Sequence, residues 1–384
     1  MSKLRAAGAV ILAKTSLPDW ATSDYGYSTV LGRTRNPYAL DRDPGGSSSG
    51  TGAGVAANLG TIGVGEDTGG SVRTPAGWCN LFGLRVTTGV VSRDGFSPLV
   101  PSQDSPGPMA RTVGDLAVLL DVMAGYDPAD DWTGAAAMQR VAGSYTAHVD
   151  RAGLEGARLG VLRGAFGTDA DLDAAPVTEA VDSALSSMEA AGATLVDPVE
   201  LPDLDARLEA TSLYVAAGRA AIDDFLSARP TAPVGSVRDL YEAGHYHELH
   251  RLFERMAEDG PRDPTDHPGY WRAVGAQGAL GRAVLRCFAT HDLDALAFPT
   301  VQVGPPTEDE LRHGPYASLR LNPVLAPRAG CPAMSVPAGF TDEGVPVGVE
   351  LLGKPFDEAR LIELAAGYER AADPRRAPPI TPAL

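Results

Sequence analysis

The sequence predicts an α/β sandwich in which helices cover a largely buried sheet. Short apolar runs typical of buried strands alternate with longer stretches whose apolar residues recur at helical spacing. This alternation is clearest between 157 and 196, where a strand at 157–162 precedes a helix that begins at Pro176 and is closed by Gly192. A second strand follows at 194–196. A chain of 384 residues, 44% of them hydrophobic, is long enough to bury a large core.

The sequence before that unit predicts a strand, then a loop, and then a helix followed by a strand. The apolar run from Gly8 to Ala13, within 6–14, predicts a short buried strand. Residues 15–27 then predict a loop of polar and aromatic groups that lines a pocket. The stretch 51–65 is rich in Gly, Ala and Val and has no charge, so we expect it to be buried on nearly every side as a helix followed by a strand.

The second half of the chain predicts more helices and the rest of the sheet. Three helical stretches follow one another and form an expected helical cap or insert, at about 208–228, 237–256 and 271–290. Two further sheet strands and an amphipathic helix are predicted at 294–299, 347–352 and 357–371.

Composition excludes several classes of partner. A formal net charge of −17 would repel phosphate backbones and anionic lipid surfaces, so we expect neither nucleic acid nor membrane partners. The three cysteines, Cys79, Cys287 and Cys331, lie in apolar surroundings at no metal-like spacing, and their odd number indicates reduced thiols in a cytosolic compartment. Because no apolar run reaches the length of a membrane span and the N-terminus lacks the features of a signal peptide, a cytoplasmic protein is expected.

Two clusters of glycine and serine carry the functional signal. They are Gly45-Gly46-Ser47-Ser48-Ser49-Gly50 and Asp67-Thr68-Gly69-Gly70-Ser71, with Ser47 and Ser71 24 positions apart. The predicted helix and strand between them would bring both serines to one rim. In the second cluster, consecutive small residues allow backbone N–H groups to converge on a developing oxyanion. The pair indicates a serine-hydrolase centre, and the alternative is a turn in which small residues only pack.

These clusters resemble those of the amidase signature hydrolases, whose nucleophile lies in an Asp-x-Gly-Gly-Ser motif and whose bridging serine opens an earlier Gly-Ser-Ser run. The resemblance extends over five further segments, at 71–76, 83–85, 89–95, 103–111 and 332–340. The Gly-Ser-Ser-Ser-Gly form and the Ser-Gln-Asp segment at 102–104 are most similar to the peptide amidase branch. The resemblance implies one domain over 1–384 with a central mixed sheet flanked by helices on both faces.

The resemblance also implies a mechanism and no cofactor. Ser71 would attack the carbonyl of a carboxylic or peptide amide and pass its proton to Ser47, and the peptide bond before Ser47 would be cis. The family completes this relay with a lysine in an apolar-Lys-Asp segment that precedes the point at which this chain begins. No lysine here is followed by aspartate, so the usual N-terminal segment is expected to be absent. The alternative is a non-hydrolytic amide-binding protein, or a subunit that takes its base from a partner.

Around the nucleophile, backbone groups are the expected oxyanion-hole donors, from Thr68, Gly69, Gly70 and Ser71. Asp67 and Arg73 are expected to orient the loop rather than react. The replacement of the family's Lys-Pro by Arg85-Val86 has no sequence-based interpretation.

Other candidates have two interpretations each. Gln103 and Asp104 either touch polar groups of the substrate or make structural hydrogen bonds. Trp20, Ala21 and Tyr25 are either pocket walls or core. Ser48 and Ser49 either take part in the chemistry or cap the following helix, and the capping role is the one expected.

The remaining polar clusters are expected to be structural. His245, His247 and His250 suit a solvated helix face better than a metal site, because the third ligand is not in helical register. Lys14 is expected at the pocket rim and not as the base. The glycine pattern at 50–54 does not match a nucleotide-binding loop. The acyl group, the amine and the oligomeric state stay open, and a homodimer is compatible with the sequence.

Overall fold

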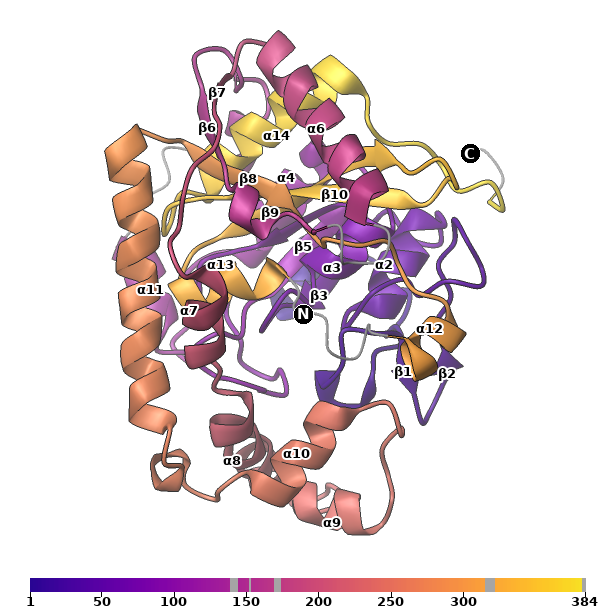
Figure 1. Cartoon of the computed structure of the whole chain (residues 1–384). Coiled ribbons are helices and arrows are strands. Elements are labelled where there is room, and N and C mark those ends of the chain that lie inside the picture. Colours follow the sequence, from indigo (N-terminus) through magenta and orange to yellow (C-terminus); the bar gives the residue numbers. More distant parts are fainter. Residues whose placement is uncertain (139–143, 152, 169–173, 315–321, 382–384) are drawn as a thin grey trace.

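A sheet of eight strands forms the centre of the computed structural model (Figure 1), which describes residues 1–138, 144–151, 153–168, 174–314 and 322–381. The strands lie in the spatial order β3 (Ile62–Glu66), β5 (Pro106–Ala110), β4 (Phe82–Arg85), β9 (Ala333–Phe340), β10 (Pro346–Leu352), β8 (Ala295–Pro299), β6 (Arg158–Val161) and β7 (Thr194–Val196). Neighbouring strands are antiparallel, except that β6 is parallel to both β7 and β8. The predicted mixed sheet is therefore confirmed.

Helices cover both faces of this sheet because successive strand residues point to opposite sides. On β8, Ala295 and Ala297 pack in one apolar cluster, whereas Leu296 and Phe298 pack in another. The first face is covered by α4 (Val113–Met123), α6 (Ala174–Ala190) and α14 (Glu358–Ala372). The second is covered by α7 (Leu204–Ala210), α11 (Tyr270–His291) and α13 (Leu325–Ala329). The sandwich expected from the sequence is thus present.

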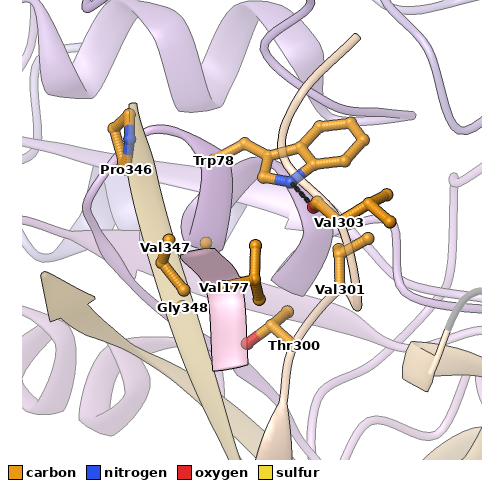
Figure 2. A pocket seen from close by; sticks show the side chains of 9 residues that line it. Trp78, Val177, Thr300, Val301, Val303, Pro346, Val347 and Gly348 are labelled. Carbon is orange, nitrogen blue, oxygen red and sulfur yellow. Dashed lines mark hydrogen bonds between the residues drawn. The ribbon is translucent and has the colours of Figure 1, made fainter. Parts of the chain in front are cut away.

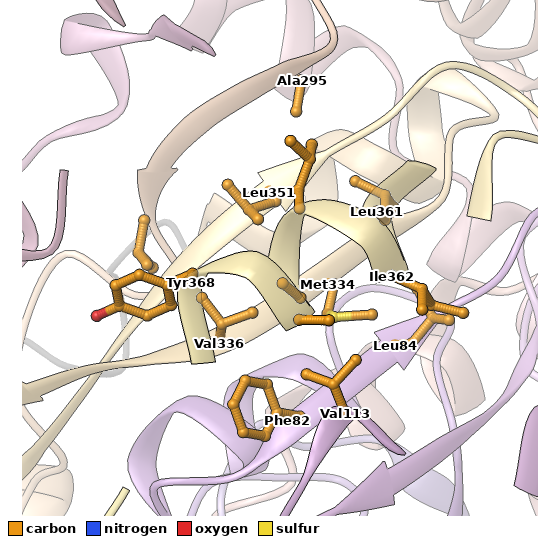
Figure 3. Packing of buried hydrophobic residues seen from close by; sticks show 14 of the residues in the cluster. Phe82, Leu84, Val113, Ala295, Met334, Val336, Leu351, Leu361, Ile362 and Tyr368 are labelled. Atoms are coloured by element: carbon orange, nitrogen blue, oxygen red, sulfur yellow. The ribbon is translucent and has the colours of Figure 1, made fainter. Parts of the chain in front are cut away.

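The first face holds the larger core. In Figure 3, Leu361, Ile362 and Tyr368 of α14 lie over Met334 and Leu351 of the sheet. All five side chains are at most 1% exposed. Burial of each apolar side chain of this size stabilises the fold by about 1.5–3 kcal/mol, so this face is a main source of stability.

The pair α2 (Ser49–Ala56) and β3 confirms the predicted helix and strand within 51–65. The helix lies so close to the strand that a Cβ at position 63 would be 2.4 Å from Thr51 Cγ2, and one at position 65 would be 2.6 Å from Ser48 Oγ. Glycine is therefore required at both positions. The expectation of burial on nearly every side was wrong, since β3 is an edge strand of the described sheet and Leu59 is 76% exposed.

The predicted strand at 8–13 was wrong. After α1 (Ser2–Ala6), these residues form no strand, and the side chains of Val10 and Leu12 are 81% and 71% exposed. An apolar run forms a strand only where a neighbouring strand accepts its hydrogen bonds, and none of the described strands pairs with it.

Two of the three long helices predicted between 208 and 290 are interrupted, and the third is α11. The first divides into α7 and α8 (Tyr214–Ser227), and between them the hydroxyl of Thr211 donates to the carbonyl oxygen of Leu208. The second divides into α9 (Val237–Glu242) and α10 (Arg251–Asp259). Gly244 adopts a left-handed φ of 67°, and the N–H of His245 then closes the end of α9 on the carbonyl of Leu240.

The other elements are short. They are β1 (Tyr27–Ser28), β2 (Gly32–Arg33), α3 (Arg73–Trp78), α5 (Thr133–Met138) and α12 (Glu308–His313). In Figure 1, α8, α9 and α10 form the lower end of the molecule and α11 stands along one side. Of the two glycine-serine turns, the one at 67–71 follows β3, and its Gly69 lies against Tyr214 of the helical segment 204–291.

Candidate active site

The two glycine-serine turns meet. Ser47 precedes α2 and Ser71 precedes α3, and the N–H of Ser48 donates to the carbonyl oxygen of Ser71 at 3.1 Å. Ser47 and Ser71 are 2% and 7% exposed. The peptide bond between Gly46 and Ser47 is cis, as the resemblance implies. The structure therefore brings the two predicted catalytic serines into adjoining turns.

The carboxylate of Asp67 organises the turn that carries Ser71. Its Oδ1 accepts the N–H of Gly70 at 2.9 Å, and its Oδ2 accepts the N–H of Val72 at 3.1 Å. Arg73 donates to both oxygens, from Nε at 3.2 Å and from Nη2 at 3.1 Å. Burial by itself would raise the pKa of Asp67, but Arg73 and Arg85 hold it below the usual range. Asp67 is therefore an anion that holds the turn from beneath.

Arg73 also reaches the far side of the turn. Its Nη1 donates to Glu350 Oε1 at 2.5 Å, and its Nη2 donates to the carbonyl oxygen of Pro323 at 2.6 Å. All three charged side chains of this group, Asp67, Arg73 and Glu350, are fully buried. Burial raises the pKa of Glu350 to about 7, against the charge of Arg73. Arg73 thus joins the turn at 67–71, named the nucleophile turn after the role predicted for Ser71, to β10 and to the segment before α13.

Arg85 is a site residue whose role the sequence did not reveal. Its Nη1 donates to the carbonyl oxygen of Asp67 and, at 3.2 Å, to Asp67 Oδ1. Its Nη2 donates to the carbonyl oxygen of Gln103 at 2.6 Å. The guanidinium therefore connects the nucleophile turn with the loop at 103–105. The sequence did contain a signal for this role, because Arg85 ends the apolar strand β4. A charged side chain is buried in such a position only if it has partners.

Gln103 and Asp104 make structural hydrogen bonds. Nε2 of Gln103 donates to the carbonyl oxygen of Thr68 at 2.9 Å, and the Thr68 hydroxyl donates to Asp104 Oδ1 at 2.6 Å. Asp104 also accepts the N–H groups of Leu99 and Val100, at 2.9 and 3.0 Å. These contacts are structural, and contact of either residue with a substrate stays a prediction.

A second carboxyl lies beneath the same turn. The N–H of Ser105 donates to Glu66 Oε1 at 3.2 Å, and the hydroxyl of Thr68 lies 3.3 Å from the same oxygen. Burial raises the pKa of Glu66 well above its usual range, and the nearby charge of Asp104 raises it further. Glu66 and Asp104 are therefore two carboxyls that both contact the hydroxyl of Thr68.

The N–H of Gly70 donates to Asp67, so it is not available to an oxyanion. This narrows the predicted oxyanion donors to Thr68, Gly69 and Ser71. A Cβ at position 69 would lie 1.9 Å from the hydroxyl oxygen of Tyr214 in α8. The helical segment thus covers the nucleophile turn directly at Gly69.

The segment 20–25 lies against the other turn. A Cβ at position 46 would be 2.8 Å from the backbone of Asp24 and Tyr25. Trp20 packs against the apolar cluster of α8 and α10, and the ring of Tyr25 stacks on Trp78 with the centroids 6.5 Å apart. Both aromatic residues and Ala21 are only half-buried, so the two interpretations of these residues, as pocket walls or as core, both stay open. Asp24 was missed; burial raises its pKa to about 6.

The predicted capping role of Ser48 and Ser49 was wrong. Ser48 is the residue before α2, but its hydroxyl makes no capping hydrogen bond. It instead accepts the N–H of Glu66 at 3.2 Å and so joins α2 to β3. Ser49 is already inside the helix, and its buried hydroxyl has no partner among the described residues.

The histidine cluster is not a solvated helix face, contrary to expectation. Residues 243–250 lie between α9 and α10, and His250 is fully buried with its Nε2 3.1 Å from the carbonyl oxygen of Tyr27. Asp19 accepts the N–H of His247 at 3.1 Å. Within the described residues, no group of three or more His, Cys, Asp or Glu side chains could hold a metal ion. The cluster attaches the 19–29 loop to the start of α10.

A small hollow beside α3 contains neither predicted catalytic serine. Figure 2 shows it lined by Trp78, Thr300, Val301 and Val303, with Trp78 Nε1 donating to the carbonyl oxygen of Val303 at 3.3 Å. Its lining is mostly apolar, so it has no chemistry to offer a polar amide. The three cysteines are buried free thiols, and no helix in the described part of the chain is long and apolar enough to cross a membrane.

Comparisons with known proteins agree with this geometry. The amidase family model matches residues 1–362. The A subunit of glutamyl-tRNA(Gln) amidotransferase of Cupriavidus taiwanensis is 34% identical over 399 residues, which cover 97% of this chain and 77% of that protein. Native peptide amidase from Stenotrophomonas maltophilia is 35% identical with a TM-score of 0.82, covering 98% of this chain and 77% of that one. The corresponding amidotransferase protein from Thermotoga maritima is 26% identical with a TM-score of 0.78, covering 99% of this chain and 79% of that one.

The fold and the two joined glycine-serine turns define an α/β enzyme that hydrolyses amides. The chain belongs to the amidase family, as the sequence predicted.

Proposed function

We propose that this protein hydrolyses a linear amide to the acid and ammonia or amine, with Ser71 as the nucleophile and Ser47 as the proton relay. The observation that carries the proposal is the way in which the nucleophile turn is held. Three of its backbone carbonyl groups are fixed by donors from the protein side, which determines where the N–H groups of the same peptides point.

The three carbonyls belong to Asp67, Thr68 and Gly70. They accept hydrogen bonds from Arg85, from Gln103 Nε2 at 2.9 Å and from the N–H of Thr74 at 2.8 Å. In a trans peptide the C=O and the following N–H point in opposite directions. The N–H groups of Thr68, Gly69 and Ser71 are therefore turned away from these donors, toward the side on which we place the oxyanion.

The chemistry then follows from the positions of the serines. Ser71 Oγ attacks the amide carbonyl carbon while its proton passes to Ser47 Oγ, Ser47 releases its own hydroxyl proton to a base, and the oxyanion that forms is stabilised by the three N–H groups. The base then returns a proton through Ser47 to the leaving nitrogen as the C–N bond breaks. Water then attacks the acyl-enzyme by the reverse sequence and releases the acid.

An unactivated serine pair needs a base to begin this sequence. Two of the three lysines make contacts elsewhere in the described structure, and the third is exposed. Lys3 Nζ lies 3.3 Å from the carbonyl oxygens of Met123 and Ala124, Lys354 pairs with Asp357 at 3.7 Å, and Lys14 is exposed. We therefore propose that the final proton acceptor is not Lys14.

Two relatives support two different functions for this chain. The 35% identity and TM-score of 0.82 with peptide amidase favour a carboxylic or peptide amide. The 34% identity with the A subunit of an amidotransferase favours a second candidate, in which this chain is the amide-hydrolysing component of a larger assembly. The first is preferred because the Gly-Ser-Ser-Ser-Gly and Ser-Gln-Asp segments are those of the peptide amidase branch.

A labelling experiment tests the assignment independently of turnover. The purified protein is treated with a fluorophosphonate probe, and the adduct is located by peptide mapping. We expect it on Ser71, with Ser71→Ala unlabelled and Ser47→Ala labelled at least about a hundredfold more slowly, because proton transfer contributes about 10²–10⁴ to such steps.

Ammonia release from a C-terminally amidated dipeptide tests the reaction itself. Ser71→Ala should abolish any release, and Lys14→Ala should leave the rate unchanged. An adduct on another serine would refute the nucleophile. Loss of activity in Lys14→Ala would show that this lysine supplies the base.

A further inference from the structure

Gln277, in the middle of α11, is hydrogen-bonded to the residue that holds the nucleophile turn. Its Nε2 donates to Gln103 Oε1 at 2.8 Å and to the carbonyl oxygen of Thr211 at 2.9 Å. Gln103 in turn is 1% exposed and donates to the carbonyl oxygen of Thr68. A continuous path of hydrogen bonds therefore connects a helix of the 204–291 segment to the proposed oxyanion site.

The orientations of both amide groups follow from this path. A backbone carbonyl only accepts, so the atom of Gln277 that faces Thr211 must be its NH₂ group. The atom of Gln103 that faces this NH₂ group must then be its oxygen. As a result, the NH₂ group of Gln103 is directed to the carbonyl of Thr68, which could not bond to an amide oxygen.

We propose that Gln277 is a positioning residue for the oxyanion site. By fixing the Gln103 amide, it holds the Thr68 carbonyl and so directs the N–H of Gly69 toward the reacting carbonyl oxygen. The proposal rests on the proposed function, because it assumes that the Gly69 N–H stabilises the oxyanion of an attack by Ser71.

The helical segment contacts the same peptide from a second direction. The Tyr214 hydroxyl of α8 lies so close to Gly69 that a Cβ there would be 1.9 Å from it. Thr68 is held by Gln103 and Asp104, and Gly69 is covered by Tyr214. The position of α11 relative to the sheet therefore sets the direction of one oxyanion donor, and a small shift of this helix would turn that donor away.

The test replaces the donor by a group of the same shape. In Gln277→Glu a carboxylate faces Gln103, so the Gln103 amide must turn its NH₂ group toward α11 and present its oxygen to the Thr68 carbonyl. We expect the maximal rate of fluorophosphonate labelling at Ser71 to fall at least about tenfold, because loss of one oxyanion donor lowers rates by about 10²–10³. The probe concentration for half-maximal labelling should stay within twofold of the wild-type value.

Three further variants separate positioning from general damage. Ala289→Glu adds the same charge at an exposed site of α11 and should label at the wild-type rate. Gln277→Lys keeps a donor and should restore at least half of that rate. Gln103→Glu accepts from Gln277 but cannot donate to Thr68, so it should repeat the defect even if Gln277→Glu does not fold.

Each outcome decides one proposal. Wild-type labelling rates in both Gln277→Glu and Gln103→Glu would refute the positioning role while leaving the nucleophile intact. A wild-type protein that is not labelled at Ser71 would instead refute the proposed function. A defect in Gln277→Glu that Gln277→Lys shares in full would show a packing role and would also overturn the proposal.

Discussion

Replacement of Arg73 by methionine should be among the most damaging single changes in this protein. The arginine is fully buried and donates to Asp67, Glu350 and the carbonyl oxygen of Pro323. Methionine fills a similar volume and offers no donor. Asp67 would keep Arg85 and two backbone N–H groups, whereas Glu350 would lose its only described cation. Breaking a buried ion pair costs about 3–5 kcal/mol, which is the loss of unfolding free energy expected for Arg73→Met.

The loss should also depend on pH. The pKa of Glu350 is already raised to about 7 in the folded protein, and without Arg73 it should rise further. A raised carboxyl pKa stabilises the folded state less as pH increases through that pKa, because the unfolded chain releases the proton more readily. The difference between wild type and Arg73→Met should therefore be about 1 kcal/mol larger at pH 8 than at pH 6, given 1.4 kcal/mol per pH unit for one proton.

Urea unfolding at the two pH values, followed by tryptophan fluorescence, measures this difference. Arg163→Met is the control, because the Arg163 pairs with Asp182 and Asp197 lie at the surface and should contribute less than about 1 kcal/mol. Adding Glu350→Gln to Arg73→Met should recover part of the loss and remove its pH dependence. A loss below 1 kcal/mol for Arg73→Met, or one of equal size at both pH values, would refute this account of the network.

Two other predictions concern the nucleophile turn and the segment 243–250 between α9 and α10. Gly69→Ala should slow labelling of Ser71 by at least about a hundredfold, because its Cβ would lie 1.9 Å from the Tyr214 hydroxyl, whereas Gly54→Ala in α2 meets nothing within 4 Å and should label normally. Equal labelling of the two variants would contradict the close contact. Burial lowers the pKa of His250 to about 4, so its contribution to stability is complete above pH 6.5 and is lost as pH falls toward 4. In urea unfolding, the free energy of unfolding of His250→Asn should therefore fall less than that of wild type between pH 7.5 and 5. If both free energies change equally with pH, His250 does not contribute to the acid sensitivity of the fold.

Much of the fold and the location of the site could be predicted because the signals are local. Period-2 and period-3.6 patterns, with Pro176 and Gly192 as boundaries, indicate β6, α6 and β7 without knowledge of any partner. The two glycine-serine clusters are equally local, because tight turns and close helix-strand packing require glycine at particular positions. The family motif then supplied the roles expected of Ser47 and Ser71.

The tertiary structure decided what depends on partners distant in sequence. The apolar run at 8–13 is exposed because no described strand lies beside it, although its composition is that of a strand. Arg73 meets Glu350 from 277 positions away, and Gln277 meets Gln103 from 174 positions away. The charge or polarity of each residue is visible in the sequence, but its role depends on which donor or acceptor the fold places within about 3 Å, and hydrogen bonds act only at that distance.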